Sequence, residues 1–440
     1  MLRWSFKAGS LAQRPQGGEG VKRLVVIVAA TLTVVVVWCG LVFLGFSEGW
    51  GRAPITSSPE PEGFISAARP QIVDAGPGNL AMVLIEDGAV AADYYTSADA
   101  PVGPHTLFQV ASLSKWVTAW GVMTLVEDGR IDLDAPVASY LTRWRLPDGP
   151  FDEDAVTVRR LLSHTAGLGD GLGYAGFASS NEVQSLEESL TQARDASPGA
   201  DGAVRVVAEP GSGWDYSGGG YTLLQLIVEE VSGQTFTDYM QAEVFQPLGM
   251  DDTTFDFDAA SRRDLAQSFT LDGVVEPLRR YTALGAASLF TSAHDMARFV
   301  AAQAPRAPDP DAVLSAETRA VMREPHAAQF GADIWGLGTM LYAPNGRGDF
   351  IIGHDGDNEP AINTAVRLDP ATGDGIVVLE TGGDLTATRL ASEWVYWKTG
   401  KVDALLFVMQ AGTMIIWMLA GSGLIILMAV VAGWRLRRRR

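Results

Sequence analysis

A serine and a lysine three residues apart, Ser112 and Lys115, carry the strongest chemical signal in this sequence. Between Leu24 and Trp397, lysine occurs once, at position 115, and arginine supplies the other permanent positive charges. Arginine stays charged in proteins, whereas a desolvated lysine beside other cations can become neutral and take a proton from a hydroxyl. Residues i and i+3 of a helix share one face. The pair therefore predicts a serine nucleophile with a lysine beside it as its base.

The helix that must hold this pair is predicted from apolar spacing. From Ser112 to Val126, apolar residues recur near helical spacing, and Asp128-Gly129 ends the segment. A helix that is apolar on most of its surface is expected to be buried at the centre of a domain.

Strands are expected at both ends of the domain, with helices between them. Residues 81–85 and 89–95 flank Glu86-Asp87-Gly88, which is typical of a hairpin. Further strands are expected at 349–353, 361–367 and 375–380, helices at 158–163, 223–231, 235–245 and 385–397, and a surface loop at 196–208. This order predicts an α+β domain whose sheet joins the two ends of the segment.

Further motifs follow the serine and lysine along the chain. They are Ser163-His164-Thr165-Ala166-Gly167, Glu209-Pro210-Gly211 with Tyr216-Ser217-Gly218 after it, Gln246-Pro247-Leu248-Gly249, Ser292-Ala293-His294-Asp295 and Gly353-His354-Asp355-Gly356. In this order and spacing, the set resembles the class C β-lactamase-like serine hydrolases, a family that also includes D-amino-acid peptidases, penicillin-binding carboxypeptidases and esterases. The resemblance covers residues 64 to about 398. It implies a β-lactamase/transpeptidase-like fold, with an antiparallel sheet flanked by helices, a helical subdomain, and the site between them.

The resemblance also assigns roles to residues by position. Ser112 would be the nucleophile of an acyl-enzyme, Lys115 would activate it, and Tyr216 would act with Lys115 as base and then as acid to the leaving group. The backbone N–H groups of Ser112 and Asp357 would form the oxyanion hole. A tyrosine is neutral near pH 7, so its action as a base requires a nearby ammonium, and Lys115 is the candidate.

Two positions depart from the family's pattern, and both concern substrate binding. Gly218 stands where the family's Tyr-x-Asn element has an asparagine that would bond an amide side chain of the substrate. His354, followed by Asp355 and Gly356, stands where the family has Lys-Thr-Gly, and esterases and D-peptidases of the family often carry His-x-Gly there. A partly neutral histidine is a poorer anion site than lysine. The expected substrate-binding positions are therefore Gly218, His354, Asp355 and Gly356, and an ester or a D-amino-acid or peptidoglycan-type amide is favoured over a β-lactam.

Other candidate side chains have structural interpretations. Lys398-Thr399-Gly400 repeats the family's Lys-Thr-Gly, but only an apolar run follows it, so a functional role is disfavoured. His164 is interpreted as shaping a turn near the site, and Trp335 as packing. No metal or cofactor is expected, because the remaining histidines lack metal-ligand spacing: His105, His294 and His326.

An apolar run lies at each end of the chain, and each is long enough to cross a bilayer. Residues 24–46 follow a basic stretch (1–23), and residues 404–434 precede another (435–440). The positive-inside rule places both termini in the cytoplasm and the catalytic domain outside the plasma (inner) membrane, in the periplasm. Phe46 to Trp50 offers no clear cleavage site, which favours an uncleaved anchor. A linker (47–63) and the hydrolase domain (64–400) lie between the spans.

The charge and cysteine content exclude some functions. The chain has 52 acidic and 33 basic residues, and a formal net charge of −19. Because the ends are basic, the central segment is more acidic than the whole chain, which argues against nucleic acid as a partner. The single cysteine, Cys39, lies in the first apolar run, so the outer domain has neither a disulfide framework nor a cysteine nucleophile. The expected partners are a small-molecule, peptide or ester substrate and the lipid bilayer.

Three alternatives stay open at this point. The first is a catalytically silent, membrane-tethered binding or sensor module, which Gly218 favours and the intact Ser112, Lys115 and Tyr216 disfavour. The second is a true β-lactamase or DD-carboxypeptidase. The third is a structural membrane partner, because the glycines of the second span permit helix packing: Gly412, Gly421 and Gly423.

Overall fold

The computed structural model describes residues 17–76, 78–169, 173–304, 312–358 and 361–438. Most of the basic N-terminal stretch (1–16) and residues 439–440 lie outside the described residues. The chain divides into a unit of residues 53–406 and a second unit formed by its two ends.

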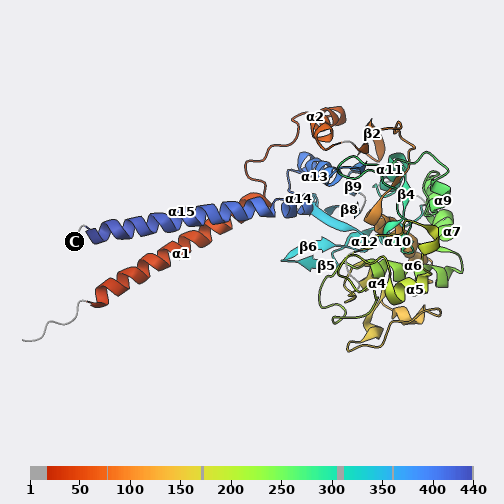
Figure 1. The fold of residues 1–440 in the computed structure, drawn as a ribbon, viewed down its shortest axis with the longest axis horizontal. Helices are drawn as coiled ribbons and strands as arrows, with labels where there is room; N and C mark the ends of the chain where they lie inside the picture. Colours follow the sequence, from red (N-terminus) through yellow and green to blue (C-terminus); the bar gives the residue numbers. More distant parts are fainter. Residues whose placement is uncertain (1–16, 77, 170–172, 305–311, 359–360, 439–440) are drawn as a thin grey trace, which may run out of the picture. The chain divides into compact units, whose positions relative to one another are not determined.

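An eight-stranded antiparallel sheet forms the centre of the larger unit (Figure 1). Its strand order is β2-β1-β10-β9-β8-β7-β6-β5. As predicted, strands from the two ends of the segment pair, with Asn79 of β1 opposite Thr381 of β10. The strands are β1 (Asn79–Glu86), β2 (Ala89–Thr96), β5 (Ala327–Gln329), β6 (Ala332–Trp335), β7 (Met340–Pro344), β8 (Phe350–Asn358), β9 (Ile362–Asp369) and β10 (Asp374–Thr381). A separate two-stranded sheet joins β3 (Phe108–Gln109) to β4 (Phe290–Thr291).

Helices cover both faces of the large sheet, which explains why β1 is an uninterrupted apolar run. Its alternate residues point to opposite faces. Met82 packs with Phe64 of α2 (Pro61–Asp74) and Trp394 of α13 (Thr386–Thr399). Val83 belongs to the larger core on the other face, which also contains Trp116. The predicted α+β architecture, with an antiparallel sheet flanked by helices, is confirmed.

The larger core is built on α3 (Ser114–Glu127) and α11 (Ala293–Ala301). Trp116 and Trp120 of α3 contact the ring of Phe299 at centroid distances of 5.1 and 4.9 Å. The predicted buried helix therefore exists. However, Ser112 lies just before it, in a 3-10 turn, η1 (Ala111–Leu113).

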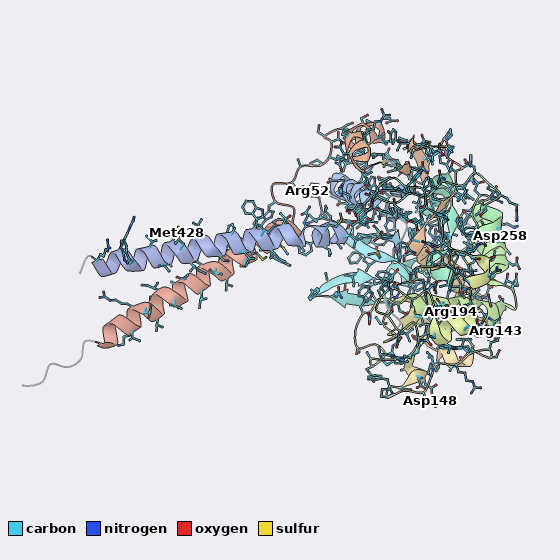
Figure 2. The ribbon with its side chains drawn as sticks, in the orientation of Figure 1. Arg52, Arg143, Asp148, Arg194, Asp258 and Met428 are labelled. Carbon is cyan, nitrogen blue, oxygen red and sulfur yellow. The ribbon has the colours of Figure 1, made fainter. Side chains whose placement is uncertain are left out.

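A helical lobe consists of α4 (Val158–Leu162), α5 (Leu186–Gln192), α6 (Gly218–Ser232) and α7 (Phe236–Met240). Figure 1 shows it on the other side of the strands from α2 and α13. Arg143, on the outside of this lobe in Figure 2, bonds Glu229 of α6 at 2.6 Å. The remaining helical segments are η2 (Val137–Ser139), η3 (Glu153–Ala155), η4 (Ser180–Glu182), η5 (Gln241–Phe245), α8 (Gln246–Leu248), α9 (Phe257–Ala260), α10 (Leu284–Ala287) and α12 (Ala316–Arg323).

Sequence patterns missed β5 to β7 and most of the short helices. The expected linker is also shorter than predicted, since α2 begins at Pro61, a proline at the first helical position.

The ends of the chain form α1 (Gly17–Ser47), α14 (Ala404–Met409) and α15 (Ala411–Arg438). Two segments are long and apolar enough to cross a membrane, Val21–Ser47 and Ala411–Arg435. The second candidate span begins at Ala411 rather than Ala404, because α14 ends at Met409. The indole of Trp38 donates a hydrogen bond to the Trp417 carbonyl at 3.2 Å.

Candidate active site

Ser112 and Lys115 lie side by side at the start of α3. The Lys115 Nζ is 3.1 Å from the Ser112 Oγ and donates to the Ala286 carbonyl at 2.8 Å. Lys115 is 1% exposed, so its amine is largely removed from water. Ala111, directly before the serine, has a positive φ of 48°, a backbone conformation that costs energy for a residue with a Cβ. The fold therefore holds the serine in a strained turn against a buried amine.

Tyr216 completes a group of three side chains. A hydrogen bond links its hydroxyl to Ser112, and the Lys115 Nζ lies 4.8 Å from its ring centroid. Burial raises the pKa of the Tyr216 phenol above its usual range, and the bond to Ser112 only partly opposes this. The phenol is therefore neutral near pH 7, which suits it to protonate a leaving group.

The rings of His164 and Trp335 pack against the ring of Tyr216. The His164 ring lies 4.4 Å from the Tyr216 ring, and the Trp335 ring lies 4.7 Å from His164 and 5.7 Å from Tyr216. The Nδ1 of His164 accepts the backbone N–H of Ser217 at 3.0 Å. Burial, with a smaller contribution from the Lys115 charge, lowers the pKa of His164, so this imidazole is neutral. His164 thus does more than shape a turn, because it contacts the candidate catalytic phenol directly.

His354 lies on β8, and its imidazole is buried beside Trp335, at a centroid distance of 5.4 Å. Its Nδ1 is 2.6 Å from the Asp355 carbonyl oxygen, an acceptor that requires the proton on Nδ1. Burial, and then the charge of Lys115, lower the pKa of His354 to about 3. At neutral pH this side chain is therefore uncharged, and its Nε2, which has no hydrogen-bond partner among the described residues, is an acceptor.

Asp355 lies on the opposite face of β8 from His354. Its carboxylate accepts bonds from Arg367 at 2.5 Å, Tyr342 at 2.6 Å and Thr388 at 2.6 Å. Arg367 also donates to Asp403 at 2.8 Å, and both of these side chains are fully buried. The structure does not bring Asp355 to the site, which corrects the expectation that it binds substrate. Neighbouring strand residues face opposite sides, so His354 and Gly356 share the face of β8 opposite Asp355, and Gly356 lies against η1.

Gly356 allows β8 to approach the serine turn. A Cβ at this position would lie 2.1 Å from the Val110 carbonyl oxygen and 3.2 Å from the Leu113 nitrogen. Thr364 of β9 donates to the same Val110 carbonyl at 2.9 Å. These contacts bring the backbone of β8 next to η1, so Asp357 follows a residue that touches the turn of Ser112.

Gly218 is the first residue of α6, two positions after Tyr216, and it lies against Tyr174. A Cβ at position 218 would be 2.9 Å from the Tyr174 ring. Sequence reasoning treated Gly218 as a missing asparagine and did not identify Tyr174. The available signal was a tyrosine directly after Gly171-Leu172-Gly173, shortly after the Ser-His-Thr motif.

The second Lys-Thr-Gly sequence lies outside this group. Lys398, at the end of α13, pairs with Glu86 at 2.9 Å and Asp374 at 3.1 Å. Its charge is neutralised by these two carboxylates at the far end of β1 and β10. No group of three or more potential metal-ligating side chains occurs within the described residues.

The arrangement suits acyl transfer through a serine ester. A hydroxyl contacts a buried amine and a neutral phenol, which are the groups needed to remove one proton and deliver another. The Lys115 amine and its neighbours His164, Trp335 and His354 are at most 2% exposed, and electrostatic interactions are stronger in such buried surroundings.

Comparison with known proteins agrees with this chemistry. A family model described as Beta-lactamase matches residues 70–400. Penicillin-binding protein 4 of Amycolatopsis lactamdurans is 30% identical over 298 residues, which cover 64% of this chain and 74% of that protein. Esterase EstB of Burkholderia gladioli is 36% identical over 170 residues, which cover 36% of this chain and 41% of the esterase, less than half of its length.

A solved structure extends the likeness to the fold. The octameric penicillin-binding protein homologue from Pyrococcus abyssi matches with a TM-score of 0.64 and 26% identity, over 77% of this chain and 78% of that chain. Together, the matches confirm the resemblance that the motifs indicated.

Proposed function

We propose, because the chain belongs to the beta-lactamase family, that it is a serine hydrolase acting through an acyl-enzyme on an ester or on a D-amino-acid or peptidoglycan-type amide. The observation that carries this proposal is the contact of the Ser112 Oγ with the Lys115 Nζ, at 3.1 Å, together with the Tyr216 bond to the same serine.

The reaction has two balanced halves. In the first, the Lys115 amine, in its deprotonated form, takes the Ser112 proton, the Oγ bonds to the substrate carbonyl carbon, and the bond to the leaving group breaks as Tyr216 protonates it. Tyr216 then regains a proton from Lys115. In the second, water bonds to the same carbonyl carbon and gives a proton to the base, and the ester bond to Ser112 breaks as the base returns that proton to the Ser112 Oγ. In both halves, the backbone N–H groups of Ser112 and Asp357 stabilise the carbonyl oxygen's negative charge.

The substrate class follows from the charge at β8. A neutral His354 in place of a lysine leaves this position of β8 without the permanent positive charge that would attract a substrate carboxylate. β-Lactam antibiotics carry such a carboxylate, so this supports an ester or amide substrate. The names of the relatives, an esterase and a penicillin-binding protein, agree with this range.

The two apolar helices support a membrane-anchored enzyme. We propose that both spans cross the plasma membrane, that both termini lie in the cytoplasm, and that the catalytic domain lies outside. The substrate would then be met on the outer side of the membrane.

The full-length protein in detergent provides the test of the chemistry. Intact-mass measurement after fluorophosphonate treatment should show one covalent adduct, and Ser112→Ala should show none. An adduct of equal yield in the mutant would contradict the assignment. A panel of esters, D-amino-acid amides and a cephalosporin then ranks the substrates, and faster hydrolysis of the cephalosporin than of any ester would contradict the proposed class.

A further inference from the structure

Tyr174 lies between the two elements that carry the proposed chemistry. Its ring packs on Gly218, two residues after Tyr216. Its backbone carbonyl accepts a hydrogen bond from the Asn358 side chain at 3.2 Å, and Asn358 directly follows Asp357. Tyr174 therefore contacts α6, which begins just after the proposed acid Tyr216, and is bonded to β8, which carries the proposed oxyanion donor Asp357.

The ring of Tyr174 fills the place that a side chain at position 218 would take. From an ideal Cβ at Gly218, the two nearest ring carbons are 2.9 and 3.4 Å away. A contact under 3.0 Å forces the neighbour to move, and an asparagine would add three more heavy atoms in the same direction. Glycine at 218 and tyrosine at 174 thus fit each other as a pair.

Hydrogen bonds fix the ring in this position. The Tyr174 hydroxyl is 2.9 Å from the Thr222 Oγ1, one helical turn after Gly218, and Thr222 in turn donates to the Gly218 carbonyl at 3.2 Å. Because the Tyr174 hydroxyl is hydrogen-bonded to Thr222, the part of the ring that faces Gly218 consists of carbon atoms. Tyr174 is 7% exposed, so close packing also holds the ring in place.

The bond between the Tyr174 backbone and Asn358 of β8 is held in place by further contacts. The Asn358 Nδ2 also donates to the Tyr281 hydroxyl at 2.7 Å, and the Tyr281 ring is buried. A Cβ at Gly176, two residues after Tyr174, would lie 2.8 Å from that ring. The segment carrying Tyr174 is therefore held closely between β8 and Tyr281.

We propose that Tyr174 determines substrate specificity by replacing a polar amide beside the acid with an apolar wall. Resting on the function proposed above, this inference narrows its substrate class to esters or amides whose acyl group is apolar, alkyl or aryl, and carries no amide side chain. The carbon atoms of a ring at this place can contact a hydrocarbon group but cannot hydrogen-bond an amide. The ring therefore favours binding of hydrocarbon acyl groups over peptide-like ones.

The first test compares Tyr174→Ala with Tyr174→Phe in the full-length protein. For each, kcat/KM is measured on p-nitrophenyl acetate, butyrate and phenylacetate. Tyr174→Phe keeps the ring and should keep the wild-type ratio of phenylacetate to acetate within about threefold. Tyr174→Ala should lower that ratio about tenfold or more, since one methylene group in a hydrophobic pocket changes selectivity by about 10- to 200-fold.

Fluorophosphonate labelling of Ser112 accompanies each measurement. Variants that label like the wild type have an intact site, so an unchanged ester ratio in a labelled Tyr174→Ala variant would overturn this inference alone. Failure of the wild type to label would instead overturn the proposed function.

The second test uses the reciprocal position. Gly218→Asn should lose most labelling, because the new side chain meets the ring. Adding Tyr174→Ala should restore labelling and raise acylation by a fluorescent penicillin above that of the wild type. Normal labelling and an unchanged ester ratio in Gly218→Asn would show that the ring does not occupy this place, and would overturn the inference even if Tyr174→Ala fails to fold.

Discussion

The imidazole of His164 lies 4.4 Å from the ring of Tyr216, tilted by 31°, and accepts the N–H of the next residue in the chain. One side chain therefore contacts both the ring of the candidate acid and the backbone that follows it. His164 also has a positive φ of 56°. Such a conformation is tolerated by asparagine better than by most residues, so the role of the ring can be separated from that of the backbone.

His164→Asn should lower kcat for an ester about tenfold or more and change KM little. The asparagine carbonyl can still accept the Ser217 N–H and fits the positive φ, but it provides no ring against Tyr216. A misplaced acid affects bond breaking more than binding. Steady-state kinetics and a thermal melt of the full-length protein provide the measurement. Wild-type kcat in a well-folded variant would show that the stack does not position Tyr216.

Lys115→Arg should be nearly as damaging as Lys115→Ala. Arginine keeps the positive charge but cannot accept the serine proton, and loss of a general base commonly costs about a hundredfold or more in rate. Single-turnover acylation by an ester reports this step directly. If the arginine variant kept most of the wild-type rate, the role of Lys115 would be electrostatic only.

The sequence predicted those parts of the site whose residues lie close together along the chain. Ser112 and Lys115 lie within one turn of each other, and apolar residues before His354 predicted its strand, although β8 (Phe350–Asn358) continues five residues beyond the predicted end at position 353. The alternation along β8 also contained the information that His354 and Asp355 face opposite sides, although the motif was interpreted as one binding unit.

Other features depend on contacts between distant segments. Tyr174 lies against Gly218, at the start of α6, and its backbone is bonded to Asn358 at the end of β8, far along the chain from both. No periodicity marks such a loop. The stack of His164 on Tyr216 likewise joins residues far apart in the sequence, so the sequence supported only a turn-shaping role for His164.

Asp355→Ala should destabilise the protein strongly, because it leaves the buried Arg367 with one carboxylate partner fewer. Removing one member of a buried ionic group costs about 3–5 kcal/mol. Asp374→Ala is the matched control, since Asp374 pairs with the partly exposed Lys398, and pairs open to solvent contribute about 1 kcal/mol or less. Urea unfolding of both variants in detergent compares them, and equal losses would contradict the structural role of the Arg367 group.

The proposed topology predicts opposite results from two reporter fusions. A reporter fused after Phe46 should lie on the outer side of the membrane, and a reporter fused at Arg440 should lie in the cytoplasm. Alkaline phosphatase and a fluorescent protein distinguish the two sides. The same side for both fusions would exclude two crossings, without affecting the assignment of the catalytic residues.

Glu380 makes the stability of the protein depend on pH in a predictable direction. It lies on β10, is buried, and its Oε2 accepts the Ala387 N–H at 3.1 Å. Burial raises the pKa of Glu380 to about 7, from an ordinary value of 4.5, and hydrogen bonds from Ala387 and Thr386 only partly oppose this. The folded state therefore holds a proton that the unfolded state has already released between pH 4.5 and 7. Stability contributed by this group is present below pH 4.5 and is lost as the pH rises through 7.

Glu380→Gln should remove this dependence, because glutamine keeps an acceptor for the Ala387 N–H and does not ionise. The variant and the wild type should have similar unfolding free energies near pH 4.5. At pH 8, the variant should be more stable by about 1–3 kcal/mol, since each pKa unit corresponds to about 1.4 kcal/mol. Other titrating groups are common to both proteins and cancel in the difference. Urea unfolding at pH 4.5, 6 and 8 measures that difference, and a constant value across the series would show that folding does not raise the pKa of Glu380.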